Sequence, residues 1–367
     1  MAFPYRADHV GSLLRPQEIL EARVNPAVTK DQLRAIEDRQ IRRILERQRD
    51  AGFRIFTDGE LRRRGFMSDF YESVTGIDNA DAVNRQWNGG AVPAGLRGHP
   101  GVVTGKIQQK KRMAKHELDF LKQHSPGAIK VTIPTPNQFP AIAYKKGISE
   151  KAYPTRSEFL WDLVPLFKAE MQALVQDGVK YLQVDAPRYS YYIDPKWRAY
   201  IQNEMGMDPN QALEEAIRVD NACIEGVNTK GVTVAMHLCR GNNQSHWYAE
   251  GGYDPIAEKL FGQLNVDAFL LEYESERAGT FEPLRFVPPG KVVVLGLVSS
   301  KVPELEKPDQ LARRIEEASR YVPLENLSLS PQCGFASAME GNLLTEEQQW
   351  RKLQLVVDTA RLVWKDA

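Results

Sequence analysis

The stretch VAMHLC, residues 234–239, places a histidine and a cysteine two positions apart at the end of an apolar run. Side chains two positions apart on a strand point to the same face, so His237 and Cys239 would face one way, about 7 Å apart along the backbone. An imidazole and a thiol held in this way can be two ligands of a metal ion. A buried histidine and cysteine can equally be ordinary core packing, so the pair alone does not identify a site.

Two more side chains with ligand chemistry follow other apolar runs of the chain. Glu272 ends the run DAFLLE, and Cys333 lies in the stretch SPQC. With His237 and Cys239 they offer one nitrogen, two thiolates and one carboxylate, a set that suits tetrahedral zinc. Because the sequence contains no CxxC pair, these ligands could meet only through the fold, unlike those of a zinc finger.

Four further polar residues follow apolar runs, and each has a structural interpretation as well as a functional one. His9 and Ser12 stand in HVGS, Glu60 stands in TDGE and Asp185 in VDAP. His9 fits a structural histidine, Glu60 a surface carboxylate or a helix start, and Asp185 a cap of the following turn. The third cysteine, Cys223, lies in a helical pattern, which favours a place in the core.

Short β-branched or apolar runs recur along the chain, with helix-period segments between them. The predicted strands are residues 5–10, 53–58, 129–134, 180–185, 232–238, 267–273, 291–298 and 327–331. The longest predicted helix follows Thr29, which can act as its N-cap, and ends at Gly52. The other helices are predicted at 155–177, 209–227, 254–263, 308–320 and 344–364. Eight strands that alternate with helices predict an α/β fold, a (β/α)8 TIM barrel, whose catalytic residues lie at the C-terminal ends of the strands.

One domain, residues 1–367, accounts for this alternation except after the second strand. Residues 66–110 include NGGAVPAGLRGHPGVVTGK, which is rich in glycine and proline. We interpret 66–110 as an insertion, with a β-ribbon at 102–108 that would form an antiparallel hairpin beside the barrel mouth.

The composition excludes several classes of protein. The 367 residues include 48 basic and 48 acidic ones, and no run is dense in lysine or arginine, so we expect no nucleic-acid or membrane-surface partner. No apolar run reaches the roughly 18 residues of a membrane span, and the N-terminus lacks the pattern of a signal peptide. Three cysteines cannot form a disulfide framework, so we expect a reduced, cytoplasmic enzyme; its oligomeric state is not indicated.

Six motifs at the predicted strand ends resemble those of one enzyme family. VGS, DGE, QVDAP, MHLC, LLEYE and SPQCGF occur in the order seen in cobalamin-independent methionine synthase. The chain resembles the single-barrel homologues of that enzyme's catalytic C-terminal domain, from about residue 5 to residue 364. The resemblance implies a (β/α)8 barrel, a catalytic zinc ion and transfer of a methyl group to the thiol of homocysteine, which forms methionine.

The resemblance also implies roles for individual residues. The zinc ligands would be His237, Cys239, Glu272 and Cys333. Ser12 matches the segment that holds the carboxylate of the amino acid, whereas Glu60 and Asp185 match the carboxylates that hold its ammonium group. His9 could pass a proton to the leaving group.

The chain departs from the family pattern where the methyl donor would bind. The full-length enzymes have two barrels, and their N-terminal barrel helps to bind polyglutamylated folate, but this chain has room for one barrel. The tryptophan that stacks on folate in the family has no counterpart in TIPTPNQFP, residues 132–140. The donor therefore stays open between a methyl-folate, a methyl-corrinoid protein and another alkyl compound.

The charge of the predicted ligand set bears on the reaction. Zinc with two thiolates and one carboxylate carries one net negative charge, which favours alkylation of a bound sulfur over hydrolysis, because hydrolytic zinc sites use less anionic ligands. Two other functions stay open. One is zinc-dependent alkyl transfer to another thiol, such as coenzyme M, and the other is a metal-free barrel lyase or a binding barrel in which the cysteines are merely buried.

Overall fold

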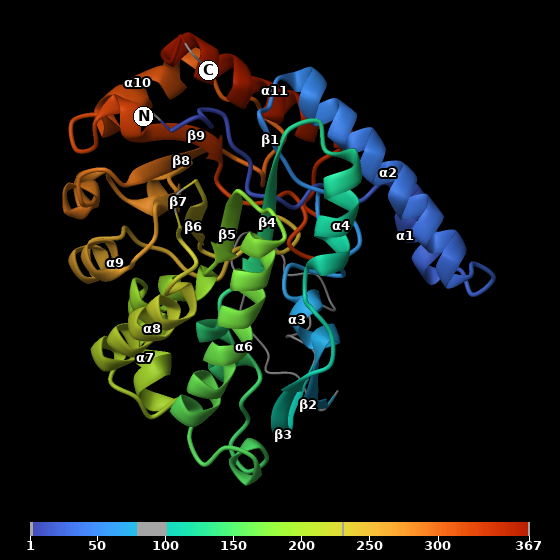
Figure 1. Ribbon diagram of the computed structural model, residues 1–367. Helices are drawn as coiled ribbons and strands as arrows, with labels where there is room; N and C mark the ends of the chain where they lie inside the picture. The colour runs from blue at the N-terminus through green and yellow to red at the C-terminus, as the bar shows by residue number, and fades with distance from the viewer. Residues whose placement is uncertain (1–2, 79–100, 230, 366–367) are drawn as a thin grey trace.

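Seven parallel strands form one curled sheet in the computed structural model, which describes residues 3–78, 101–229 and 231–365 (Figure 1). The order of neighbouring strands is β1-β4-β5-β6-β7-β8-β9. β1 pairs with β4, and from β4 onward each strand pairs with the next one along the chain. The strands are β1 Ile55–Phe56, β4 Ala128–Pro134, β5 Tyr181–Asp185, β6 Thr233–Leu238, β7 Ala268–Glu272, β8 Val292–Val298 and β9 Leu327–Pro331. The last six agree with the predicted strands to within one residue at each end.

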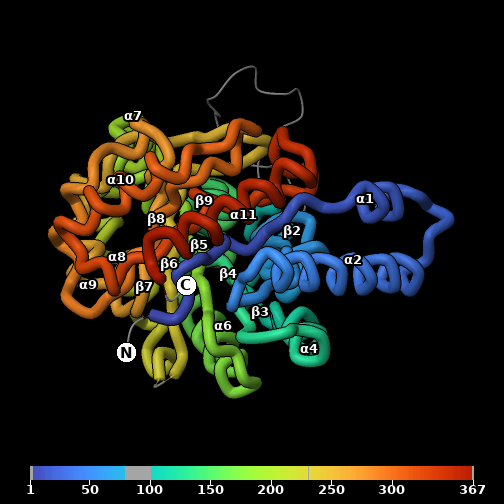
Figure 2. Tube along the Cα trace, turned by 90° about the horizontal axis from the view of Figure 1, so that it is seen from above, coloured from blue at the N-terminus to red at the C-terminus, as the bar shows by residue number. Residues whose placement is uncertain are grey.

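Helices follow the strands and pack around the outside of the sheet. Figure 2 shows α6 and α8 to α11 outside the strands, with α1 and α2 as an arm that projects to one side. The helices are α1 Gln17–Val24, α2 Lys30–Ala51, α3 Ser68–Ser73, α4 Lys115–His124, α5 Phe139–Ile142, α6 Arg156–Gln176, α7 Pro195–Asn203, α8 Pro209–Ile224, α9 Ala257–Gln263, α10 Pro308–Ala318 and α11 Glu346–Val363. Short 3-10 turns are η1 Pro136–Gln138, η2 Ser149–Lys151, η3 Pro187–Tyr192, η4 Glu276–Ala278, η5 Glu282–Phe286 and η6 Leu324–Asn326. None of the helices in the described ranges is both long and apolar enough to span a bilayer.

The limits of α2 confirm the caps predicted from its sequence. Thr29 accepts a hydrogen bond from the backbone N–H of Gln32, whose side chain in turn accepts from the backbone N–H of Thr29. Such a capping box satisfies two N–H groups that the first helical turn leaves without partners. The helix ends at Gly52, whose φ of 101° is readily reached only without a Cβ.

The strands are buried on both faces, as a parallel sheet covered by helices requires. Every residue of β8 is buried, and so is every residue of β5, β7 and β9. One apolar cluster lies between the sheet and the helices, and a smaller one fills the space that the sheet encloses. The smaller cluster consists of Val10, Ile55, Tyr181, Ala235, Ala268, Leu270, Val292 and Val294.

The predicted first strand, residues 5–10, is wrong. In its place the chain makes a single parallel bridge from Ala7 to Leu329 of β9. Toward β1 the contacts come from side chains, since His9 Nε2 lies 3.3 Å from the carbonyl oxygen of Ile55 and Thr57 Oγ1 donates to the carbonyl of Gly11 at 3.1 Å. The prediction of a (β/α)8 barrel is therefore confirmed as far as a curled seven-stranded parallel sheet, and no eighth strand completes it within the described residues.

A buried ion pair joins the segment before β1 to β4, the strand next to β1 in the sheet. Lys130 of β4 donates to Asp8 Oδ1 at 2.8 Å and to the carbonyl oxygen of His9 at 2.6 Å. The hydroxyl of Tyr181 donates to the other oxygen of Asp8 at 2.7 Å. Both charged side chains are fully enclosed, so each charge depends on the other for compensation.

The segment predicted as an insertion contains α3 and an antiparallel pair of strands. β2 Val74–Asp78 pairs with β3 Val102–Gln109, which covers the predicted ribbon at 102–108. The pair starts directly at the end of α3 and stands apart from the parallel sheet in Figure 1. Residues 79–100, which hold most of the glycine-rich stretch, lie outside the described residues.

We predict that Lys130→Met lowers the free energy of unfolding by about 3–5 kcal/mol, because it leaves the Asp8 carboxylate buried without a compensating charge. Urea unfolding followed by circular dichroism measures the loss. The double variant Asp8→Asn with Lys130→Met removes both charges and should recover part of it. A single variant as stable as the parent would show that the ion pair does not hold the sheet together here.

Candidate metal and substrate site

Three of the four predicted metal ligands come together at the C-terminal ends of β6 and β9. His237 lies near the end of β6, Cys239 follows that strand directly, and Cys333 lies two residues beyond Pro331, the last residue of β9. The ligand atoms of His237, Cys239 and Cys333 all lie within 4.8 Å of one another. One metal ion could therefore contact all three side chains.

The surroundings of these side chains suit ligands better than packing. The three residues are 3%, 6% and 4% exposed, in the order His237, Cys239, Cys333. Apart from the neighbouring Cys333 thiol, neither ring nitrogen of His237 has a hydrogen-bond partner among the described residues. A buried imidazole without an oxygen or nitrogen partner is costly unless something else, such as a metal ion, takes its nitrogen.

The two thiols strongly affect each other's ionisation. The pKa of Cys333 lies well below its ordinary value, mainly because of a hydrogen bond with the neighbouring Cys239 thiol. His237 and Lys301 lower it further, whereas burial raises it. The same contact with Cys333, together with burial, raises the pKa of Cys239. Cys333 is therefore the thiol of the pair that loses its proton more readily, and a bound cation would favour the thiolate form of both cysteines.

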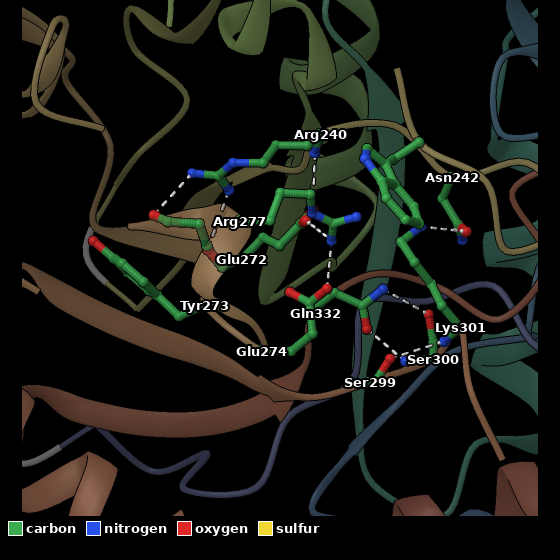
Figure 3. A network of polar contacts seen from close by, with 12 residues as sticks. Arg240, Asn242, Glu272, Tyr273, Glu274, Arg277, Ser299, Ser300, Lys301 and Gln332 are labelled. Carbon is green, nitrogen blue, oxygen red and sulfur yellow. Dashed lines mark hydrogen bonds and ion pairs between the residues drawn. The ribbon is translucent and has the colours of Figure 1, made fainter. Parts of the chain in front are cut away.

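Glu272, the fourth predicted ligand, lies outside this group. Its Oε1 accepts a hydrogen bond from Arg277 Nη2 at 2.6 Å, and its Oε2 accepts from the backbone N–H of Arg240 at 2.8 Å (Figure 3). Burial opposes its ionisation, but Arg277, Arg240 and Lys301 outweigh burial and lower the pKa of Glu272. Glu272 is thus a buried carboxylate that is held beside Arg240, the residue after Cys239.

Polar side chains that the sequence analysis did not single out fix the turn after Cys239. Lys301 Nζ donates to Asn242 Oδ1 at 2.8 Å (Figure 3). It also donates to the carbonyl oxygen of Gly241 at 3.0 Å. Asn242 Nδ2 donates to the carbonyl oxygen of Gly334, the residue after Cys333, at 2.7 Å. The turns that carry the two thiols are therefore linked directly. In the sequence, Lys301 and Asn242 are marked only by their nearness to strand ends, a property that many other residues share.

The three ligands line a cavity of about 240 Å³. Its wall also contains Ser12, Glu60 and Asp185, so the predicted amino-acid contacts lie beside the predicted metal ligands. A further part of the wall is apolar or aromatic and comes largely from the segment around α3; these residues are Phe66, Met67, Tyr71, Pro187 and Tyr248. The cavity thus combines a soft-ligand group, two carboxylates and an apolar side.

The two cavity carboxylates differ in their contacts. Asp185 is the register partner of His237 on the neighbouring strand, and its Oδ1 accepts from Gln183 Nε2 at 2.7 Å. Burial, with a further contribution from Glu60, raises the pKa of Asp185 to about 7, although His237 opposes the shift. Glu60 Oε1 accepts from Thr132 Oγ1 at 2.7 Å, whereas its Oε2 is buried without a hydrogen-bond partner among the described residues.

Ser12 and His9 lie in different places relative to the cavity. Ser12 reaches it beside Gly334, where an added Cβ would lie 1.9 Å from Ser12 Oγ, so only glycine fits there. His9 is not part of the cavity wall, and its ring packs edge-on against Phe53 with 5.0 Å between ring centroids. Burial, helped by the charge of Lys130, lowers the pKa of His9 to about 4. These contacts suit a neutral structural histidine.

Comparison with known proteins gives one consistent result. Residues 10–361 match the family described as the catalytic domain of cobalamin-independent synthase. The uncharacterized protein YxjH of Bacillus subtilis is 41% identical over 368 residues, which cover 99% of this chain and 95% of that protein. A methionine synthase of Sulfurisphaera tokodaii is 26% identical, over 96% of this chain and 91% of that protein.

A solved structure is similar in fold along its whole length. The crystal structure of a candidate vitamin-B12 independent methionine synthase from Listeria monocytogenes superposes with a TM-score of 0.74 at 32% identity, and the match covers 99% of both chains. The family match, the relatives and this structure agree over nearly all of the sequence. The chain therefore belongs to the cobalamin-independent methionine synthase family, as a homologue of its catalytic domain.

Proposed function

We propose that the protein transfers a methyl group to the thiol of homocysteine and so forms methionine, with zinc as its metal. The observation that carries the proposal is the group formed by His237, Cys239 and Cys333, whose ligand atoms lie within 4.8 Å of one another in a cavity that also holds Glu60 and Asp185. The family and the methionine synthase of Sulfurisphaera tokodaii support a methyltransferase. Its expected location is the cytoplasm, where thiols stay reduced.

The donor set favours zinc over other ions. One imidazole and two thiolates are borderline-soft ligands, and three protein ligands leave a position open for a substrate atom. When bound there, zinc would take up the acceptor's sulfur and let its thiol lose a proton near neutral pH. Glu272 stays our predicted fourth ligand, and to act as one it would have to leave the hydrogen bonds from Arg277 and Arg240.

The cavity carboxylates would select the acceptor. Glu60 and Asp185 would receive the ammonium group of homocysteine, and Ser12, which lines the same cavity beside Gly334, would hold its carboxylate. Two carboxylates in an enclosed site disfavour an anionic thiol that lacks an ammonium group, because like charges repel strongly where water is scarce. This argues against a coenzyme M-type acceptor.

The apolar side of the cavity would receive the methyl donor. Phe66, Met67 and Tyr71 line it, next to the ligand group. Such a wall excludes water from the reacting sulfur and orients the donor for in-line attack on its methyl carbon. The chemical identity of the donor stays open between a methyl-folate, a methyl-corrinoid protein and another alkyl compound.

We predict that protein purified without added metal contains about one zinc ion per chain, as a three-ligand site of this kind implies. Cys333→Ala should lose most of this zinc, as measured by elemental analysis. Cys223→Ala is the matched control, because Cys223 is also buried but lies in α8, away from the ligand group, and this variant should keep its zinc. Parent protein without zinc, or equal zinc in both variants, would contradict the metal assignment.

We predict that the zinc-loaded protein forms methionine from homocysteine with at least one member of a panel of methyl donors. Asp185→Asn should lower kcat/KM for homocysteine roughly ten- to a hundred-fold, because it weakens a hydrogen bond between charged groups. The same variant should act on γ-mercaptobutyrate, which is homocysteine without its amino group, at least as well as the parent does, because it removes one of the two carboxylates that disfavour such an acceptor. A zinc-loaded protein that neither binds homocysteine nor forms methionine would overturn the proposal.

A further inference from the structure

We propose that Thr132 and Arg63 are positioning residues for acceptor specificity: they hold one oxygen of Glu60 so that the other is presented to the ammonium group of the acceptor. The inference rests on the proposed function, because it assigns how that site distinguishes an amino-acid thiol from one without an amino group. Thr132 lies on β4, and Arg63 lies three residues after Glu60. The structure does not place either of them in the wall of the cavity.

The two oxygens of Glu60 have different surroundings. Oε1 accepts the hydrogen bond from Thr132 Oγ1 at 2.7 Å, and Arg63 Nη1 lies 3.7 Å from the same oxygen. Oε2 is buried without a hydrogen-bond partner among the described residues, and Glu60 lines the cavity. A buried carboxylate oxygen without a partner costs free energy unless a ligand donates to it. An ammonium group in the cavity would supply that donor.

Arg63 fixes the direction of the Thr132 hydroxyl. Arg63 Nη1 donates to Thr132 Oγ1 at 3.1 Å, and Arg63 Nη2 donates to the carbonyl oxygen of Thr132 at 2.8 Å. Because the hydroxyl oxygen already accepts from a cation, its own proton is directed to Glu60 Oε1. A hydrogen bond that follows another in this way is strengthened by it, particularly in a buried site.

Arg63 is itself anchored by two buried carboxylates. Its Nε and Nη2 donate to the two oxygens of Glu117 at 2.7 and 2.6 Å, and Asp69 Oδ2 lies 2.7 Å from Nε. Asp69, His116 and Glu117 could on distance alone surround a metal ion, but the guanidinium group already supplies the cation there. Arg63 therefore ties α3 and α4 to the hydroxyl that holds Glu60.

The backbone around Glu60 leaves its side chain little choice. Glu60 has a φ of 55°, in the left-handed region where residues other than glycine are strained, and such strain is common where a side chain must be aimed. An added Cβ at Gly11 would lie 2.8 Å from the Thr132 methyl carbon and 3.2 Å from Glu60 Oε1. The glycine thus makes room for the Thr132–Glu60 contact.

Thr132→Val tests the inference, with Thr132→Ser as its matched control. Valine keeps the methyl group that packs on Gly11 but loses the hydroxyl, whereas serine keeps the hydroxyl and loses the methyl group. Zinc-loaded variants are compared by kcat and KM for homocysteine and for γ-mercaptobutyrate. Thr132→Val should raise KM for homocysteine about ten-fold and keep kcat within about two-fold of the parent value. Its kinetic constants for γ-mercaptobutyrate should equal those of the parent. Thr132→Ser should behave like the parent with both thiols.

A second variant keeps the inference testable if the valine variant does not fold. Arg63→Lys keeps the positive charge between Asp69 and Glu117 but loses the fork that reaches Thr132, and it should give the same selective rise in KM. Equal losses for both thiols, or a serine variant as impaired as the valine one, would show a merely structural role and overturn the inference. A parent protein that binds neither thiol would instead overturn the proposed function, and this inference with it.

Discussion

The buried pair of Lys130 and Asp8 holds the molecule together where its backbone pairing is weakest. β1 has two residues, and the segment before it reaches β9 through a single bridge, so few ladder hydrogen bonds cross this part of the sheet. The ammonium group of Lys130 compensates for these missing bonds because it binds both the Asp8 carboxylate and the carbonyl oxygen of His9. Ser12 and Glu60 follow the two short segments, so the acceptor side of the cavity depends on this contact.

The site itself follows from one property of parallel sheets, which is that all strands end at the same edge. Neighbouring strands in register place Asp185 beside His237, and the curl of the sheet returns Cys333 to Cys239 although 93 residues separate the two. Neighbouring charges and burial then shift the pKa values of the side chains that the backbone brings together. Arg277 and Arg240 lower the pKa of Glu272, while burial raises the pKa of Asp185 to about 7.

The sequence predicted an element correctly where a local pattern of residues determines both its burial and its limits. Apolar runs predicted β4 to β9 because those strands are covered on both faces, and the caps at Thr29 and Gly52 limited α2 because they satisfy its terminal N–H and C=O groups. The prediction of a strand at residues 5–10 failed because these residues pair with β9 only at the bridge from Ala7 to Leu329, and side chains such as those of His9 and Thr57 make the contacts toward β1. Glu272 was placed at the correct strand end, but its partner Arg277 lies in a 3-10 turn that no periodicity signals. Thr132 and Arg63 were missed because a hydrogen-bond chain depends on distances between three elements.

The link from Lys301 through Asn242 to Gly334 has a consequence for how an ion would be acquired. These contacts join the two sulfur-bearing turns without using any of the ligand atoms, so they would hold the turns together with or without a bound ion. In small zinc domains the metal must organise the chain, and the free energy of binding is spent on folding. A site whose ligands are already arranged does not use binding free energy for folding, so nearly all of that free energy would hold the ion in place. Loading and release of the ion would then leave the rest of the protein folded.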